Sequence, residues 1–231
     1  MDKAFSFFEL KTGLLWDDSY NDLPCRLYGL RGAYEMRLMP CSTYFIYVQR
    51  GTVLLNRRWP LYPGMFASAT RAVLEGDELS EAIIIERIGY FGAMLIGGPI
   101  EAQGRLKYID GCTDSLLISP LMFGDPCLNH LHFPPDVKQT MHTHPSVRIG
   151  MVTKGWGKCE TPDGLYDLRP GLVFVIHTDG QHRFLTDREA MDVIAFHADS
   201  DFGPTHEDHP MINRTIVDGV SAKDIEEIRT K

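Results

Sequence analysis

The stretch Gln139–Gly157, QTMHTHPSVRIGMVTKGWG, carries the strongest signal in the chain. Its two histidines, His142 and His144, stand two residues apart. On an extended strand, side chains at this spacing point to the same face, and the same alternation continues to Ser146 and Arg148. Two imidazoles on one face can bind one ion, so the stretch predicts a strand that carries part of a metal site.

A third ligand is expected from a different strand. His182 follows the apolar run GLVFVI (171–176) and the turn HTDGQH (177–182), so it can enter the same interior from a neighbouring strand. Three neutral imidazoles suit iron, zinc, nickel or copper better than magnesium or calcium. We therefore predict one divalent transition metal bound by His142, His144 and His182.

Most of the chain has the pattern of short strands. Apolar runs such as TYFIYV (43–48), AIIIERI (82–88) and MDVIAF (191–196) are rich in β-branched and aromatic residues and alternate with Gly, Pro, Asn or Asp turns. This pattern predicts an all-β sandwich or barrel. Near the end of the chain, Ser221 followed by Asp224 three residues later predicts the start of a short helix.

The chain also contains a weak internal repeat. Gly51 matches Gly155, and Pro63-Gly64 matches Pro170-Gly171, with similar apolar runs on either side. A period near 105 residues indicates two copies of a domain-sized unit. We predict a first copy over 1–100, a join over 101–126 marked by Gly and Pro, a second copy over 127–212, and a tail over 213–231 with the short helix.

All nine histidines follow residue 129, so the two copies do not share the same chemistry. The first copy is expected to be structural or to form part of a dimer interface. In the second copy, His197 ends the strand MDVIAF and is a candidate for a supporting or substrate-contacting role. The remaining five are interpreted as structural or loop residues: His130, His132, His177, His206 and His209.

The amino-acid composition indicates which classes of binding partner are unfavourable for this chain. The chain has 231 residues, 44% of them hydrophobic and 23% charged, which is typical of a globular protein. Its net charge of −8 disfavours nucleic acid or an anionic membrane as the main partner. No signal peptide or membrane span is recognisable, and the five cysteines are scattered without a C-x-x-C pair, so we expect reduced thiols and a cytoplasmic location.

The spacing of these residues resembles the two sequence motifs of the cupin superfamily. Because the chain also contains an internal repeat, it resembles a bicupin, a protein with two cupin domains. The first cupin motif, G-x5-H-x-H-x3-4-E-x6-G, corresponds to Asp136-x5-His142-x-His144-x3-Arg148-x6-Gly155. The second, G-x5-P-x-G-x2-H-x3-N, corresponds to Gly171-x5-His177-x-Asp179-x2-His182-x3-Thr186. The resemblance covers about residues 128–198 and is faint in the first copy. It implies two tandem jelly-roll barrels, of which the first is degenerate and the second holds the metal.

Arg148 departs from the cupin pattern at the position of the glutamate. Arginine carries no free lone pair and cannot bind a metal ion. Beside a cation it is repulsive unless an anion lies between them, so we interpret Arg148 as the group that binds a substrate carboxylate or phosphate. The alternatives are that Arg148 points outward or pairs with an acid such as Asp192.

Together, the resemblance and the interpretation of Arg148 imply a metal-dependent enzyme that acts on a small anionic metabolite, with a chemistry similar to that of three-His cupin dioxygenases. A three-His non-haem dioxygenase with iron, or with zinc, nickel, manganese or copper instead, is the leading hypothesis. A non-redox isomerase or lyase and a non-catalytic binding protein are the alternatives. The motifs contain no inward Glu, Tyr or Lys base, which favours an oxygenase or a binding protein. A homodimer is also expected.

Overall fold

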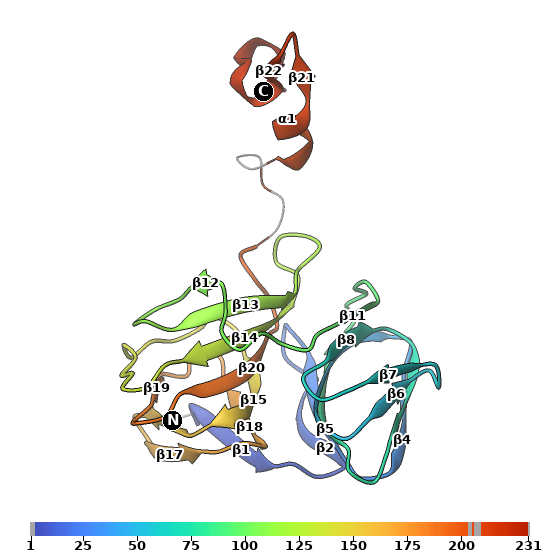
Figure 1. Cartoon of the computed structure of the whole chain (residues 1–231), viewed down its shortest axis with the longest axis vertical. Helices are drawn as coiled ribbons and strands as arrows, with labels where there is room; N and C mark the ends of the chain where they lie inside the picture. Colours follow the sequence, from blue (N-terminus) through green and yellow to red (C-terminus); the bar gives the residue numbers. More distant parts are fainter. Residues whose placement is uncertain (1–2, 203–204, 206–208, 231) are drawn as a thin grey trace.

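A computed structural model describes residues 3–202, 205 and 209–230 of the chain. Two large antiparallel sheets lie side by side, and each is accompanied by a smaller sheet (Figure 1). The predicted all-β class is confirmed. The predicted strands at 43–48, 82–88, 171–176 and 191–196 are all present, within one or two residues of the expected bounds.

The first large sheet has the order β11-β8-β5-β10-β3-β2, and its small companion has the order β4-β9-β6-β7. The bounds of these strands are β2 Gly13–Asp18, β3 Cys25–Arg31, β4 Tyr34–Leu38, β5 Ser42–Arg50, β6 Val53–Leu55, β7 Trp59–Leu61, β8 Phe66–Ala69, β9 Ala72–Gly76, β10 Glu81–Ile88 and β11 Leu95–Gly97.

The second large sheet has the order β1-β18-β15-β20-β14-β13-β12, and its companion has the order β17-β16-β19. The bounds are β1 Phe5–Glu9, β12 Leu106–Lys107, β13 Thr113–Ile118, β14 Cys127–Phe133, β15 Arg148–Gly155, β16 Gly157–Thr161, β17 Gly164–Leu168, β18 Leu172–Ile176, β19 Arg183–Leu185 and β20 Met191–His197.

The two large sheets repeat the same strand order. The run β8-β5-β10-β3-β2 in the first corresponds to β18-β15-β20-β14-β13 in the second. Each sheet also has an irregularity at the same place, which leaves Gln49 unpaired in β5 and Thr153 unpaired in β15. These two residues meet, because Gln49 Nε2 donates to the Thr153 carbonyl at 2.7 Å.

The matched glycines have the same backbone conformation. Gly51 has φ of 66° and Gly155 has φ of 71°, a region that favours glycine. A Cβ at Gly155 would lie 1.7 Å from the Ala190 carbonyl oxygen, and one at Gly51 would lie 2.4 Å from the Ser80 amide nitrogen. Both turns therefore require glycine for steric as well as conformational reasons.

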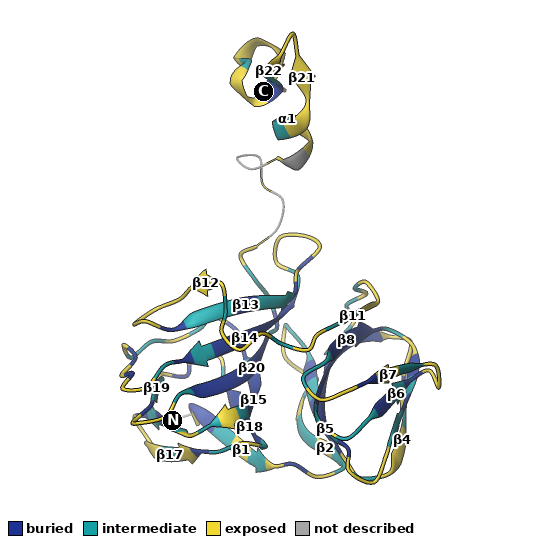
Figure 2. Cartoon of the chain, viewed as in Figure 1, coloured by how far each residue is buried: buried dark blue, intermediate teal, exposed yellow. Residues whose placement is uncertain are grey.

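The hydrophobic core has three parts, one inside each unit and one between them. The shared part contains residues of both large sheets, and its rings of Phe45 and Phe196 lie 4.9 Å apart. Figure 2 shows the buried residues concentrated along the central strands of both sheets. The outer face of each large sheet is thus covered by the other unit, which explains why runs such as EAIIIERI are apolar without alternation.

The sheets depart from the predicted residue boundaries in two places. Strand β1, assigned by sequence to the first copy, pairs with β18 of the second sheet, with Phe5 opposite Ile176. The predicted join contains β12 and β13, and β13 pairs with β14. The pairing of β1 joins residues that are more than 160 positions apart in the sequence, so no local pattern indicated which sheet β1 joins.

The C-terminal segment differs from its predicted form. The described α-helix is α1, Pro210–Arg214, followed by the two-stranded sheet of β21 Ile216–Val217 and β22 Val220–Ser221. Ser221 does cap a helical turn, since its side chain accepts from the Lys223 amide, but η1 Ala222–Asp224 and η2 Glu226–Ile228 are short 3-10 turns. Among the described residues, no helix has the length and apolarity needed to cross a membrane.

Candidate metal centre

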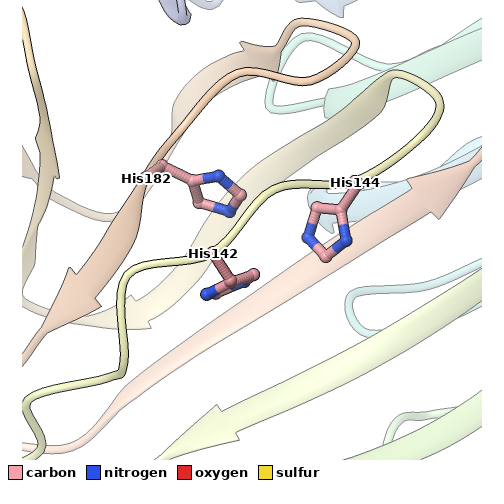
Figure 3. Close-up of side chains that lie close together, drawn as sticks. All are labelled: His142, His144 and His182. Carbon is pink, nitrogen blue, oxygen red and sulfur yellow. The ribbon is translucent and has the colours of Figure 1, made fainter.

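Three histidines converge inside the second unit (Figure 3). The ligand atoms of His142, His144 and His182 all lie within 4.8 Å of one another, and among the described residues no carboxylate or thiol joins this group. His142 and His182 form an isolated β-bridge, in which each amide donates to the other's carbonyl at 3.0 Å. His142 and His144 therefore lie on an extended segment before β15 rather than on the predicted strand.

Backbone carbonyls orient two of the three rings. His142 Nδ1 lies 2.7 Å from the Thr140 carbonyl oxygen, and His182 Nδ1 lies 2.8 Å from the Gly180 carbonyl oxygen. A carbonyl can only accept, so in both rings Nδ1 carries the proton and Nε2 keeps its lone pair. Such a partner on the second ring nitrogen is the usual support of a metal-binding histidine.

Burial keeps the imidazoles in the form that binds a metal. The pKa of His144 is lowered to about 3, first by burial and then by the nearby charge of Arg148. The pKa of His182 is lowered to about 4, again chiefly by burial. Both rings are therefore neutral at physiological pH, as a ligand must be.

Arg148 lies in the same interior as the three histidines. Its side chain is 11% exposed, which excludes the outward-facing alternative. Nη1 donates to the Ser146 hydroxyl at 2.5 Å and approaches Asp199 at 3.8 Å, while Nε is buried without a hydrogen-bond partner. Asp192, the other sequence candidate for a partner, instead contacts His132 Nδ1 at 2.7 Å and His130 Nε2 at 3.3 Å.

His197 stands directly beside Arg148. The two residues are paired across β15 and β20, and the His197 ring centroid lies 6.4 Å from that of His144. Burial, followed by the charge of Arg148, lowers the pKa of His197 well below its ordinary value, so this ring is neutral too. His197 therefore lies beside the three-histidine group, and its supporting or substrate-contacting role stays a prediction.

Comparisons with known proteins identify the architecture. No protein-family model and no curated sequence matches the chain. Solved structures do match. A cupin 2 conserved barrel domain protein from Leptotrichia buccalis has a TM-score of 0.55 at 14% identity, covering 85% of this chain and 90% of that one. The chain has a cupin fold.

Two further solved structures share this cupin fold. Protein YlbA of E. coli gives a TM-score of 0.55 at 13% identity, with 84% of each chain covered. A salicylate 1,2-dioxygenase from Pseudaminobacter salicylatoxidans gives 0.58 at 9% identity, covering 81% of this chain and 76% of that one. At such low identity, the likeness concerns the fold.

The cupin barrel of the second unit encloses a cavity of about 50 Å³. Its lining brings together the three histidines, Arg148 and His197, and adds Gln139 and two polar residues that the motifs did not indicate, Tyr108 and Asp114. Burial raises the pKa of Asp114, whose Oδ2 accepts from Asn129 at 2.6 Å while Oδ1 is buried without a partner. Both residues lie in the predicted join, where no motif marks them.

The remaining histidines lie outside this cavity. His130 and His132 share Asp192, as expected for structural residues. His177 follows β18, and its Nε2 lies 2.9 Å from the Ser6 hydroxyl on β1. His209 caps α1 through its ring nitrogen rather than packing on a barrel, and His206 lies outside the described residues.

Proposed function

We propose that this chain is a metal-dependent bicupin that acts on a small anionic metabolite, foremost as a three-histidine non-haem dioxygenase. One observation carries the proposal: the buried guanidinium of Arg148 shares a cavity with the imidazoles of His142, His144 and His182. The salicylate 1,2-dioxygenase among the structural neighbours supports this class of chemistry. The first barrel, which contains no histidine, is taken as the degenerate copy.

The donor set fits a transition metal. His142, His144 and His182 would hold the ion, with iron first and zinc, nickel, manganese or copper as alternatives. Such an ion would polarise a bound substrate and, if redox-active, permit chemistry with oxygen. Because the described part of the chain offers three protein ligands for this ion, coordination positions would be left for other molecules.

Arg148 would bind the anionic group of the substrate. Its Nε has no partner in the structure, and its guanidinium offers a fork of donors that matches a carboxylate. The neighbouring His197 would contact the same substrate from β20. Since the cavity is buried, an ion pair formed there would be stronger than one in water.

The size of the cavity limits the substrate. About 50 Å³ is the space of one or two water molecules, well below the 300–1,000 Å³ usual for drug-sized ligands. A substrate must therefore be very small, or the hairpin of β12 and β13 that carries Tyr108 and Asp114 must move aside when it enters.

Asp114 supports a second candidate function, a non-redox isomerase or lyase. The sequence motifs contain no inward Glu, Tyr or Lys base, but Asp114 lines the cavity with a raised pKa and an unpartnered oxygen. A carboxyl group with a raised pKa is a candidate general acid or base. A non-catalytic binding protein is the remaining alternative.

Metal analysis tests the site itself. We expect about one transition-metal ion per chain in purified protein, and its loss in the His142→Ala/His144→Ala double variant. Metal should raise the melting temperature, because the folded state binds it more tightly than the unfolded chain. Two tightly bound ions per chain, or full metal content in the double variant, would contradict the assignment.

Substrate screening separates the three functions. With metal-loaded protein and a panel of small carboxylic acids, an oxygenase consumes oxygen and Asp114→Asn retains much of this activity. An isomerase or lyase consumes none, but exchanges a substrate proton in heavy water, and Asp114→Asn abolishes the exchange. A binding protein does neither, although its ligand raises the melting temperature.

Size-exclusion chromatography with light scattering tests the predicted homodimer.

A further inference from the structure

The first unit contains a buried polar cluster that the proposed function does not use. The carboxylate of Glu86, only 4% exposed, accepts hydrogen bonds from three hydroxyl groups: Ser42 at 2.6 Å, Tyr44 at 3.0 Å and Tyr28 at 3.0 Å. Arg26 approaches the same carboxylate at 3.6 Å. A carboxylate is costly to bury, so a cluster of this kind inside a barrel needs an explanation.

This cluster occupies the place of the Arg148–His197 pair, which lies beside the three histidines in the second unit. Tyr44 pairs with Glu86 across β5 and β10, just as Arg148 pairs with His197 across β15 and β20. The repeat aligns the two pairs, because Tyr44 precedes Gly51 by seven residues and Arg148 precedes Gly155 by seven. Both pairs face the interior of their own barrel.

The metal ligands themselves have apolar counterparts. His142 lies six residues before Arg148 and is bridged to His182. In the first unit, Leu38 lies six residues before Tyr44 and is paired with Ala72. Leucine and alanine cannot bind a metal ion, so these positions of the first barrel offer no metal ligands, and its polar centre is the cluster around Glu86.

A cavity reaches this centre from outside. It has a volume of about 320 Å³, and its lining includes Glu86, three tyrosines (Tyr28, Tyr34 and Tyr44), Met36 and Met39. The volume suits a ligand of several non-hydrogen atoms. It is also more than six times the volume of the cavity beside the three histidines.

The charges around this cavity favour a cation. Arg26 lies closer to Asp17, at 3.0 Å, than to Glu86. Glu35 at the cavity rim contacts both Arg37, at 3.3 Å, and Arg57, at 2.7 Å, and Arg57 also contacts Glu75. With these cations already matched, Glu86 supplies the excess negative charge. Aromatic rings around a cavity are a recognised arrangement for binding organic ammonium groups, and a carboxylate beside them adds an opposite charge.

We propose that the first barrel binds a small organic ammonium ion, with Glu86 as its counter-charge and the three tyrosines and two methionines as its walls. The two barrels of one chain then recognise ligands of opposite charge. Tyr28 supports this arrangement from a second direction: burial, followed by the charge of Glu86, raises its pKa to about 12, so its hydroxyl stays protonated and keeps donating to the carboxylate.

Calorimetric titration of the full-length, metal-loaded protein tests the proposal. The cationic probes are choline and ethylammonium, and the neutral and anionic counterparts of choline are 3,3-dimethyl-1-butanol and 3,3-dimethylbutanoate. We expect one of the cations to bind with a dissociation constant of about 1 mM or lower, the alcohol to bind at least about tenfold more weakly, and the carboxylate not to bind.

Variants locate the binding. Glu86→Gln should lower the affinity for the cation about tenfold or more, whereas Glu81→Gln on the same strand, whose carboxylate contacts Arg31 and Arg50 outside the cavity, should leave it within twofold. Tyr34→Ala, at a half-exposed position that can be changed without unfolding, should weaken binding severalfold. The His142→Ala/His144→Ala variant should bind the cation as the wild type does.

Three results would overturn the proposal. The first is that neither cation binds more tightly than the neutral alcohol. The second is that Glu86→Gln, or Tyr34→Ala if the former does not fold, keeps wild-type affinity. The third is that the double histidine variant abolishes cation binding, which would move the site to the second barrel.

Discussion

Under the proposed function, Arg148 selects the charge of the ligand that the second barrel binds. A glutamate there would complete a set of three histidines and one carboxylate, whereas the arginine places a buried positive charge beside the imidazoles. Its only acidic neighbour at ion-pair distance among the described residues is Asp199, at 3.8 Å and partly exposed. Under the proposed function this positive charge favours an anionic ligand, and Asp114, which lines the same cavity, has a raised pKa because of burial.

Substituting Arg148 should change the selectivity of the site. In Arg148→Glu a repulsive cation becomes a possible ligand, so a divalent metal should bind at least as tightly as in the wild type. The affinity for the anionic ligand should fall about ten- to a hundredfold, because a hydrogen bond to a charged group contributes about 1.5–3 kcal/mol. Titration of metal and of the carboxylate found by screening measures both effects.

Arg148→Lys is the matched control for charge. It keeps the positive charge but not the fork, so it should recover only part of the affinity for the anion. If Arg148→Glu left both the metal and the anion affinities unchanged, the arginine would have no role in ligand binding.

The buried histidines should make the metal-free protein sensitive to acid. His144 and His182 have pKa values near 6.5 when unfolded, but about 3 and about 4 in the folded state. Between these folded-state pKa values and pH 6.5, the unfolded chain binds protons that the folded chain does not. The free energy of unfolding should thus be highest above pH 6.5 and fall as the pH is lowered towards about 4.

Melting temperatures of metal-free protein between pH 7.5 and pH 4 measure this dependence. His144→Asn removes one of the two groups and should flatten the curve. A melting temperature that rises on acidification, or an unchanged slope in His144→Asn, would count against neutral buried imidazoles.

At the level of elements, the hairpin of β12 and β13 closes the metal-site cavity. Its tip is attached to the histidine segment, because Asp110 Oδ2 accepts from the Thr140 amide at 2.7 Å, and the Thr140 carbonyl in turn accepts from His142. Tyr108 and Asp114 lie on either side of this tip and line the cavity. The hairpin is therefore the element that must move for a larger substrate to enter.

Removing this attachment should open the cavity. Asp110 has φ of 53°, so Asp110→Gly deletes the acceptor without backbone strain, and Asp110→Asn keeps both an acceptor and the conformation. We expect Asp110→Gly to release metal to a chelator about fivefold faster or more, because a net hydrogen bond contributes about 1 kcal/mol, and Asp110→Asn to stay near wild type. Equal release rates in all three proteins would show that the hairpin does not control access.

At the level of the whole molecule, the two units depend on each other. They share a hydrophobic core that includes Phe45 and Phe196, and the first strand of the chain belongs to the second sheet. Phe5 on β1 is fully buried against Phe174 of the second barrel. The unit that carries the histidines is thus complete only when the N-terminal segment is in place.

Deleting residues 1–9 should destabilise the protein and expose the edge of β18. Loss of a buried phenylalanine alone costs about 3–5 kcal/mol, which corresponds to about 6 °C or more in melting temperature for a chain of this size. An exposed edge strand also promotes aggregation, which light scattering detects. Deleting residues 216–231 is the control, since β21 and β22 pair only with each other, and should change the melting temperature by about 2 °C or less. A wild-type melting temperature after the first deletion would show that β1 contributes little.

The sequence alone was sufficient to predict the all-β class, the central strands and the grouping of the three histidines. These features depend on local chemistry: alternation of apolar residues, glycine at turns of positive φ such as Gly51 and Gly155, and imidazoles two residues apart. The repeat was also visible, because the same steric demand for glycine recurs in both copies.

Only the tertiary structure decided which residues share a cavity. Asp114 and Tyr108 meet the histidines because β13 pairs with β14 in one particular register, and β1 joins the second sheet through contacts with residues more than 160 positions away. From the sequence, the side chain of Arg148 could point into the barrel or out of it, and the structure shows that it lines the cavity. Pairing between distant strands is determined by the packing of the whole chain. No local sequence pattern around Glu86 or Asp114 therefore indicates which side chains form hydrogen bonds with these carboxyl groups.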